Sequence, residues 1–157
     1  MKKVIIGIVA MVASAVLGLC GCAKDCRKTV ASMESMTLTL QGMRFTNVYE
    51  IVNKDGKTEI GRFKKRYAQG KDTLELEASA VCDTADFIDL LNACGVLCWD
   101  GFHGKHPKNV KDGIMFDFSA IVNGGQKIQA DGSENFPEGY HMFVRELNKM
   151  LAAQEEG

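Results

Sequence analysis

Two cysteines and two histidines lie close enough in the sequence to suggest a metal site. Cys94, Cys98, His103 and His106 follow the spacing C-x3-C-x4-H-x2-H, and zinc binds thiolate sulfur and imidazole nitrogen tetrahedrally. This spacing differs from that of the common zinc modules. Cys94 falls on the apolar side of an expected helix, whereas both histidines fall in a polar loop. A metal- or thiol-dependent domain is therefore the alternative hypothesis, and we expect no bound metal or cofactor.

The chain offers little for nucleophilic or acid–base catalysis. It contains only 3 histidines, no G-x-S-x-G motif and no cysteine beside a histidine suited to act as its base. Asp100 and Asp117 would be the one carboxylate pair to consider. However, Asp100 precedes Gly101 in an Asp-Gly turn, and Asp117 lies on the polar face of an alternating strand. We therefore predict that the protein is not an enzyme.

The polar stretch from Gly101 to Gly113 is the strongest candidate for a binding site. Long polar loops between ordered elements often carry function, and lysine and histidine here could meet an anionic partner or a lipid headgroup. The predicted binding residues are Trp99, Asp100, Lys105, His106, Lys108 and Lys111. The competing interpretation is a solvated connection that Trp99 and Phe102 fix to the core.

Alternating apolar and polar residues predict an antiparallel sheet. The segments with this pattern are Ser35–Gln41, Asn47–Val52, Thr58–Tyr67, Leu74–Ala80, Ile114–Val122 and Lys127–Ala130. Asp55-Gly56 predicts a tight hairpin, and Gln69-Gly70 a second turn. The apolar run Val96–Phe102 predicts a further short strand, and His103–Gly113 predicts a loop.

Two segments have helical periodicity instead. The first is capped by Asp83 or Thr84 and stops at Gly95. The second opens at Pro137 and repeats apolar residues at a spacing of 3.6, with Gly139 weakening its first turn. We expect both amphipathic helices to cover one face of the sheet, so the predicted fold class is α+β.

The amino terminus has the features of an export signal. Lys2 and Lys3 precede the uncharged apolar run Val4–Leu19, which is shorter than the ~20 residues needed to span a bilayer. Leu19-Cys20-Gly21-Cys22 resembles the lipobox of bacterial lipoproteins. This resemblance implies cleavage before Cys22 and a thioether from its sulfur to diacylglycerol, with palmitate-like chains holding the protein in the membrane.

Three other interpretations of this terminus stay open. They are a secretory peptide that is cut and released, a buried helix of the domain, and modification at Cys20, which would put bulky Leu19 before the cleavage site. The favoured interpretation divides the chain into a signal peptide (1–21), a lipidated cysteine and tether (22–32) and a single α+β domain (33–157). It places that domain on the extracytoplasmic face of the cell membrane.

The cysteines left after this processing are Cys26, Cys82, Cys94 and Cys98. An even number in an exported domain allows disulfides. Cys82 and Cys94 flank the first helix at about 15 Å, beyond the ~7 Å that a disulfide spans between α-carbons. The pairs Cys82–Cys98 and Cys94–Cys98 stay open, as does a fully reduced state.

The second half of the chain carries a further resemblance. The runs WDGF (99–102), NVKDG (109–113), FDFSAIVNGGQKIQADG (116–132) and FPEGY (136–140) resemble a group of bacterial lipoproteins without an assigned activity. The resemblance implies a tethered extracytoplasmic domain and assigns no catalytic residue.

The net charge of the chain bears on its possible partners. With 19 Lys+Arg against 20 Asp+Glu the net charge is -1, so we expect no nucleic-acid partner. We expect a binding or scaffolding module of the cell envelope. Its partners would be membrane lipid, through the anchor, and an envelope protein or wall polymer.

Overall fold

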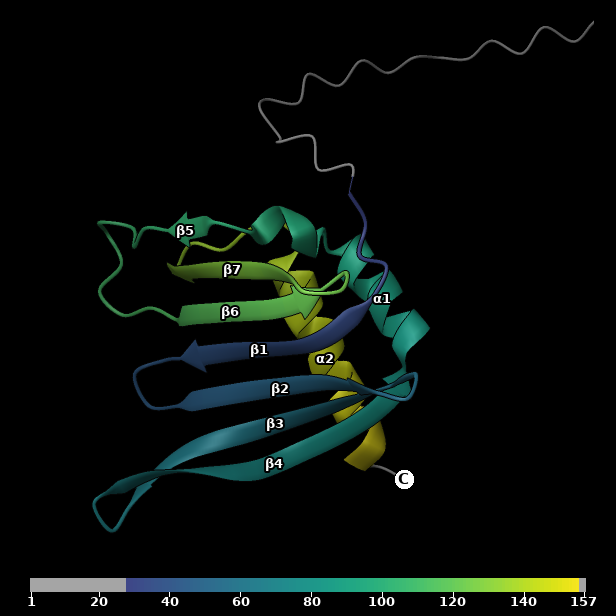
Figure 1. Cartoon of the computed structure of the whole chain (residues 1–157). Coiled ribbons are helices and arrows are strands. Elements are labelled where there is room, and N and C mark those ends of the chain that lie inside the picture. The colour runs from purple at the N-terminus through teal and green to yellow at the C-terminus, as the bar shows by residue number, and fades with distance from the viewer. Residues whose placement is uncertain (1–27, 156–157) are drawn as a thin grey trace, which may run out of the picture.

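The described part of the protein is one mostly antiparallel sheet with helices packed on a single face (Figure 1). The computed structural model describes residues 28–155. The strand order is β4-β3-β2-β1-β6-β7-β5, and only the short β5 runs parallel to its neighbour, β7. The elements are β1 Met33–Gln41, β2 Thr46–Lys54, β3 Lys57–Ala68, β4 Lys71–Asp83, α1 Thr84–Ala93, the 3₁₀ helix η1 Val96–Trp99, β5 Phe102–Gly104, β6 Met115–Val122, β7 Gln126–Ser133 and α2 Tyr140–Glu155. The predicted α+β class is confirmed.

The predicted signal peptide and the predicted lipidation site, Cys22, lie outside the described residues. Between residues 28 and 155 no helix has the length and apolar character to cross a membrane.

Glycine-containing turns fix the strand registers. Asp55 and Gly56 have φ values of 51° and 79°, and Gln69 and Gly70 have φ values of 52° and 77°. Two successive residues with positive φ are the mark of a type I′ turn, whose twist suits an antiparallel hairpin. Both predicted turns are therefore present, and they join β2 to β3 and β3 to β4.

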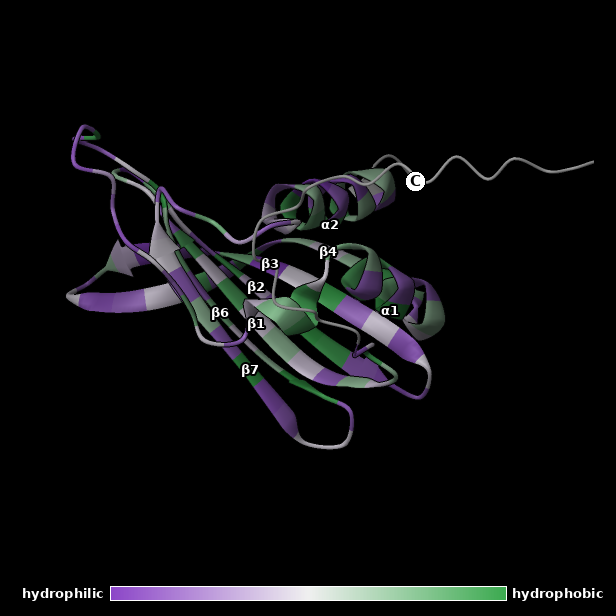
Figure 2. Cartoon of the chain, turned by 90° about the horizontal axis from the view of Figure 1, so that it is seen from above, coloured by the Kyte–Doolittle hydropathy of each residue, from purple (hydrophilic) through white to green (hydrophobic). Residues whose placement is uncertain are grey.

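Strict alternation divides the sheet into a buried and an open face. In β1, Met36, Leu38 and Leu40 are buried while Thr37 is exposed. Leu38 lies opposite Tyr49 on one side and Phe118 on the other, so buried side chains form continuous rows across the strands. The alternation of apolar and polar residues along each strand is visible in Figure 2. Both helices cover the buried face, where Phe87 of α1 and Phe143 of α2 meet at 6.3 Å between ring centroids.

The centre of this core is Trp99, which is only 1% exposed. Its ring lies 5.0 Å from that of Phe118, 5.7 Å from Phe143 and 6.0 Å from Tyr140, measured between centroids. Its indole N–H donates to the backbone carbonyl oxygen of Glu138 at 2.8 Å. One side chain therefore joins η1 to the sheet and to the start of α2.

Two local predictions were wrong. The run Val96–Phe102 is not a strand, because Gly95 (φ 64°) ends α1 and the Cys98 N–H donates to the Gly95 carbonyl, which closes a 3₁₀ turn. The short strand β5 follows the 3₁₀ helix. It consists of Phe102, the last residue of the predicted strand, and of His103 and Gly104, the first two residues of the predicted loop. The predicted start of the first helix is confirmed, because Asp83 occupies the N-cap position of α1, although its carboxylate pairs with Lys57 and makes no side-chain cap.

The start of the last helix also differs from the prediction. The Tyr140 N–H donates to the Pro137 carbonyl at 3.2 Å, so residues 137–139 form a turn and α2 begins at Tyr140. Gly139 has a φ of 80° and lies so close to α1 that an added Cβ would meet the carbonyl oxygen of Cys94. It is therefore a packing requirement between two helices and not a weak point within one.

We expect Trp99→Ala to lower the free energy of unfolding by about 4 kcal/mol, because it opens a large cavity and leaves the Glu138 carbonyl without its donor. Trp99→Phe should cost less, since it keeps most of the ring contacts. The matched control is Tyr67→Ala: Tyr67 is 77% exposed, so the change should stay within about 0.5 kcal/mol. Urea denaturation followed by circular dichroism measures all three. Equal losses for Trp99→Ala and Tyr67→Ala would contradict this account of the core.

Candidate functional site

The two ends of the sheet differ in what they present. At one end, which we call the tether end, residues 28–34 enter the fold beside α1 and the β6–β7 turn (Figure 1). There the side-chain amide of Asn92 binds both the N–H and the carbonyl of Val30, at 2.8 and 3.0 Å. Asn123 accepts a hydrogen bond from the Ala31 N–H at 2.7 Å. The chain that leads from the amino terminus is thus held firmly at this end.

The opposite end, which we call the loop end, consists of three connections: residues 42–45 between β1 and β2, the hairpin tip 64–75 of β3 and β4, and residues 105–114 between β5 and β6. The antiparallel registers place all three together, because β1 ends, β3 ends and β6 begins at this edge. Four of the predicted binding residues lie here, all of them exposed: Lys105, His106, Lys108 and Lys111.

The other two predicted binding residues are structural. Trp99 is buried in the core. The Asp100 carboxylate accepts a hydrogen bond from the Gln129 N–H at 3.0 Å, which fixes the turn before β5 to β7. Asp100 is also not paired with Asp117, which lies on the open face directly opposite Asp131.

His106 holds the loop in shape. Its Nε2–H donates to the Val110 carbonyl at 2.7 Å, and in that neutral tautomer Nδ1 accepts from the Ser133 hydroxyl at 2.8 Å. The Glu134 carboxylate accepts from the Ile114 N–H at the far side of the loop. Ser133 of β7 and Glu134 after it hold the loop through these hydrogen bonds, so the backbone that carries its lysines has a defined position.

Sequence analysis did not predict the exposed apolar residues at the same end of the sheet. Large apolar side chains at the loop end are exposed to solvent: Met43, Phe45, Tyr67, Ile114 and Met115. Met43 and Tyr67 are the most exposed, at 72% and 77%. The sequence contained a signal for two of them, because Gly42-Met43-Arg44-Phe45 places two large apolar residues in a turn where polar residues are usual.

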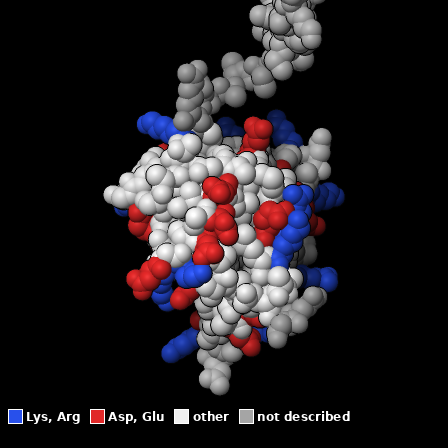
Figure 3. Space-filling model, turned by 90° about the vertical axis from the view of Figure 1, so that its right-hand side faces the viewer, with Lys and Arg blue, Asp and Glu red and all other residues white. Residues whose placement is uncertain are grey.

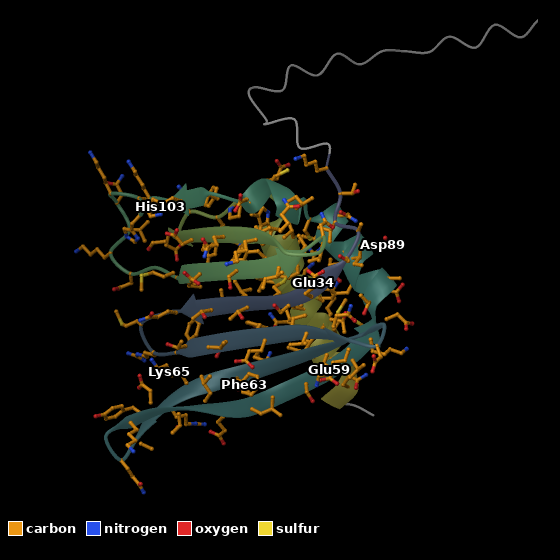
Figure 4. The ribbon with its side chains drawn as sticks, viewed as in Figure 1. Glu34, Glu59, Phe63, Lys65, Asp89 and His103 are labelled. Atoms are coloured by element: carbon orange, nitrogen blue, oxygen red, sulfur yellow. The ribbon has the colours of Figure 1, made fainter. Side chains whose placement is uncertain are left out.

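Charge is distributed unequally between the two ends. The three loop-end segments hold eight Lys or Arg and three Asp or Glu, whereas the tether-end segments 28–34, 53–59, 81–92 and 121–127 hold four lysines and six acidic residues. Figure 3 faces the tether end, with acidic side chains over its middle. In Figure 4 the labelled Glu34, Glu59 and Asp89 lie toward the tether end, and Lys65 and His103 toward the loop end.

Several loop-end cations have no ion-pair partner among residues 28–155. Lys64, Lys65 and Arg66 pair with Glu77, Asp72 and Glu75. The cations of this end outside any such pair are Arg44, Lys71, Lys105, Lys108 and Lys111. Their charge is therefore available to an external anion.

The four residues of the metal hypothesis are engaged separately. Cys94 is buried at the end of α1, and Cys98 is disulfide-bonded. His103 Nδ1 contacts the Asp131 carboxylate at 2.6 Å, and His106 braces the loop. In the described stretch no group of three or more His, Cys, Asp or Glu residues is arranged to hold a metal ion.

The open disulfide pairings are also decided in part. Cys82 and Cys94 are free, so the pairs Cys82–Cys98 and Cys94–Cys98 are wrong, and so is a fully reduced state. The partner of Cys98 lies outside the described residues. Burial raises the pKa of both the Cys82 and the Cys94 thiols, and Asp86 and Asp83 raise that of Cys82 further. Both thiols therefore stay protonated at neutral pH.

Comparison with known proteins adds no assignment: no family model, no curated protein and no solved structure matches this chain.

The raised pKa values predict slow thiol chemistry. Since the thiolate is the reacting form, iodoacetamide at pH 8 should alkylate Cys82 and Cys94 more slowly than a free cysteine peptide, with rates still rising above pH 9. Asp86→Asn should speed labelling of Cys82, because it removes a carboxylate that disfavours the thiolate. Asp89→Asn on the same helix is the control and should leave the rate unchanged. Mass spectrometry of timed samples reads each site, and rapid labelling of Cys94 would contradict the burial described.

Proposed function

We propose that the protein is an extracytoplasmic lipoprotein, anchored through Cys22, whose loop end binds a negatively charged polymer of the cell envelope. The observation that carries the proposal is the set of unpaired cations and exposed apolar side chains at the loop end. These lie at the opposite end of the strands from the point where the chain enters the fold (Figure 1). A protein held by its amino terminus would therefore present this surface away from its anchor.

Support for the anchor comes from the sequence. The basic start, the apolar run and Leu19-Cys20-Gly21-Cys22 together have the order of a lipoprotein signal. Two or more acyl chains make membrane attachment stable, since each buried methylene contributes about 0.8 kcal/mol.

Support for the ligand class comes from the composition of the loop end. The lysines of the β5–β6 loop offer positive charge at fixed positions. Met43, Phe45 and Tyr67 are exposed apolar side chains at the same end of the sheet. A polymer with repeated anionic groups can meet several of these cations at once, which adds small individual contributions.

Mass spectrometry of the membrane-fraction protein tests the anchor. We expect a chain that starts at Cys22 and carries the diacylglycerol mass on that residue. Cys22→Ala should abolish both cleavage and acylation, whereas the control Cys20→Ala should retain both. An unmodified chain beginning at Met1 would refute the anchor.

Charge reversal tests the loop end. Replacing Lys105, Lys108 and Lys111 by Glu should weaken binding to heparin, used as a model polyanion, and to the purified anionic wall polymer by at least about tenfold, or ~1.4 kcal/mol. The loss should shrink as salt screens the charges. The matched control reverses Lys54, Lys57 and Lys127 at the tether end, with the same change in net charge, and should bind like the unaltered protein.

Two outcomes would contradict this assignment. One is an equal loss in both triple variants, which would mean that only net charge matters. The other is binding to phosphatidylglycerol vesicles without binding to either polymer, which would make the loop end a headgroup site. Calorimetry at two salt concentrations distinguishes these cases.

A further inference from the structure

The bonded state of Cys98 points to a second covalent constraint on this protein. Cys98 lies on η1 with its residue exposed, directly before the buried Trp99. It is disulfide-bonded, and Cys82 and Cys94 are both free. The sequence contains six cysteines, so the partner is Cys20, Cys22 or Cys26.

The path of the chain at the tether end discriminates among these three. Lys28 and Thr29 line the same small cavity of about 120 Å³ as Cys98, together with Asn92 and Gly95. The paired hydrogen bonds between Asn92 and Val30 hold this stretch beside the end of α1. The first described residues are therefore already next to Cys98.

We propose that Cys26 and Cys98 form a disulfide that fastens the tether to η1. Cys26 precedes Lys28 by two residues, so it lies within about 7 Å of a residue that lines the same cavity as Cys98. A disulfide requires its two α-carbons to lie within about 7 Å of each other. Cys22 precedes Lys28 by six residues and would have to fold back. In addition, and resting on the proposed function, lipidation occupies the Cys22 sulfur and cleavage removes Cys20, which leaves Cys26 as the available thiol.

The bond forms by oxidation. The Cys26 and Cys98 thiols lose two protons and two electrons and form one S–S bond. The electrons and protons reduce a disulfide of an oxidised thiol–disulfide oxidoreductase, or of oxidised glutathione in vitro, to two thiols. Exchange of this kind proceeds through a mixed disulfide, and the exposed position of Cys98 leaves it open to the attacking partner.

The disulfide would shorten the chain segment that connects the lipid to the fold. Without the bond the lipid-bearing residue is joined to the fold through the whole stretch that precedes Val30. With it, only the four residue steps from Cys22 to Cys26 separate the lipid from η1, at most about 14 Å when extended. The tether end of the sheet would then be kept close to the membrane and the loop end directed outward.

Peptide mapping of the unreduced full-length protein from membranes tests the proposal. After free thiols are blocked with iodoacetamide, we expect a tryptic peptide containing Cys26 linked to peptide 72–105, with fragmentation placing the bond at Cys98. Alkylated Cys26, or a bond from Cys20 or Cys22 to Cys98, would overturn it. The same spectrum reports the acyl mass on Cys22, so failure of the anchor and failure of the disulfide are read separately.

A second measurement uses variants that leave the folded core intact. Cys26→Ser should free the exposed Cys98, so that maleimide adds one rapidly reacting label per chain. Cys20→Ser is the matched control and should add none. No new label in Cys26→Ser would overturn the proposal.

Discussion

The contact on which the rest of the structure depends is the burial of Trp99. Its indole N–H satisfies the Glu138 carbonyl, and its ring meets Phe118 of the sheet and Phe143 of α2. A buried donor needs a partner, and here the partner lies in the turn that starts the last helix. The same residue sits one step before the turn that leads into β5, so the position of the braced loop follows from it. The loop end is thus connected directly to the buried core around Trp99.

The sheet could be predicted largely from local pattern. Alternation in β1 and β6 specified which side chains point inward, and Asp55-Gly56 specified a hairpin, because both signals act between near neighbours in the chain. The failures have a common cause. The run Val96–Phe102 is short and apolar, which does not distinguish a strand from a buried helical turn. β5 is held by its parallel partner β7 and has no local signal. Gly139 is dictated by contact with α1, which sequence spacing does not reveal.

The candidate site was predictable in part for the same reasons. Lys105, Lys108 and Lys111 lie in a polar loop, and loops of that kind are exposed. That Met43, Phe45 and Tyr67 belong to the same surface depends on the strand registers, which bring three distant connections to one edge. Trp99 and Asp100 resembled members of the loop because they precede it in sequence. Their roles, in the core and on the β7 backbone, come from tertiary contacts. The proposed partner of Cys98 could not be predicted for the same reason. Spacing along the chain favours cysteines that are close in sequence, whereas the fold brings Lys28 and Thr29 beside Cys98 of η1.

The position of β4 at the edge of the sheet has a consequence for crowding. Its outer backbone groups have no partner strand within residues 28–155, and such an edge can recruit another chain. With the anchor proposed above, copies would meet on a bilayer surface more often than in free solution, which would favour edge-to-edge joining. Two β4 strands that met antiparallel about Leu76 would set Glu75 of each opposite Glu77 of the other. These carboxylates already pair with Arg66, Arg62 and Lys64 of β3. Such a meeting would bring carboxylates close together and disturb these ion pairs, which disfavours edge-to-edge association of β4.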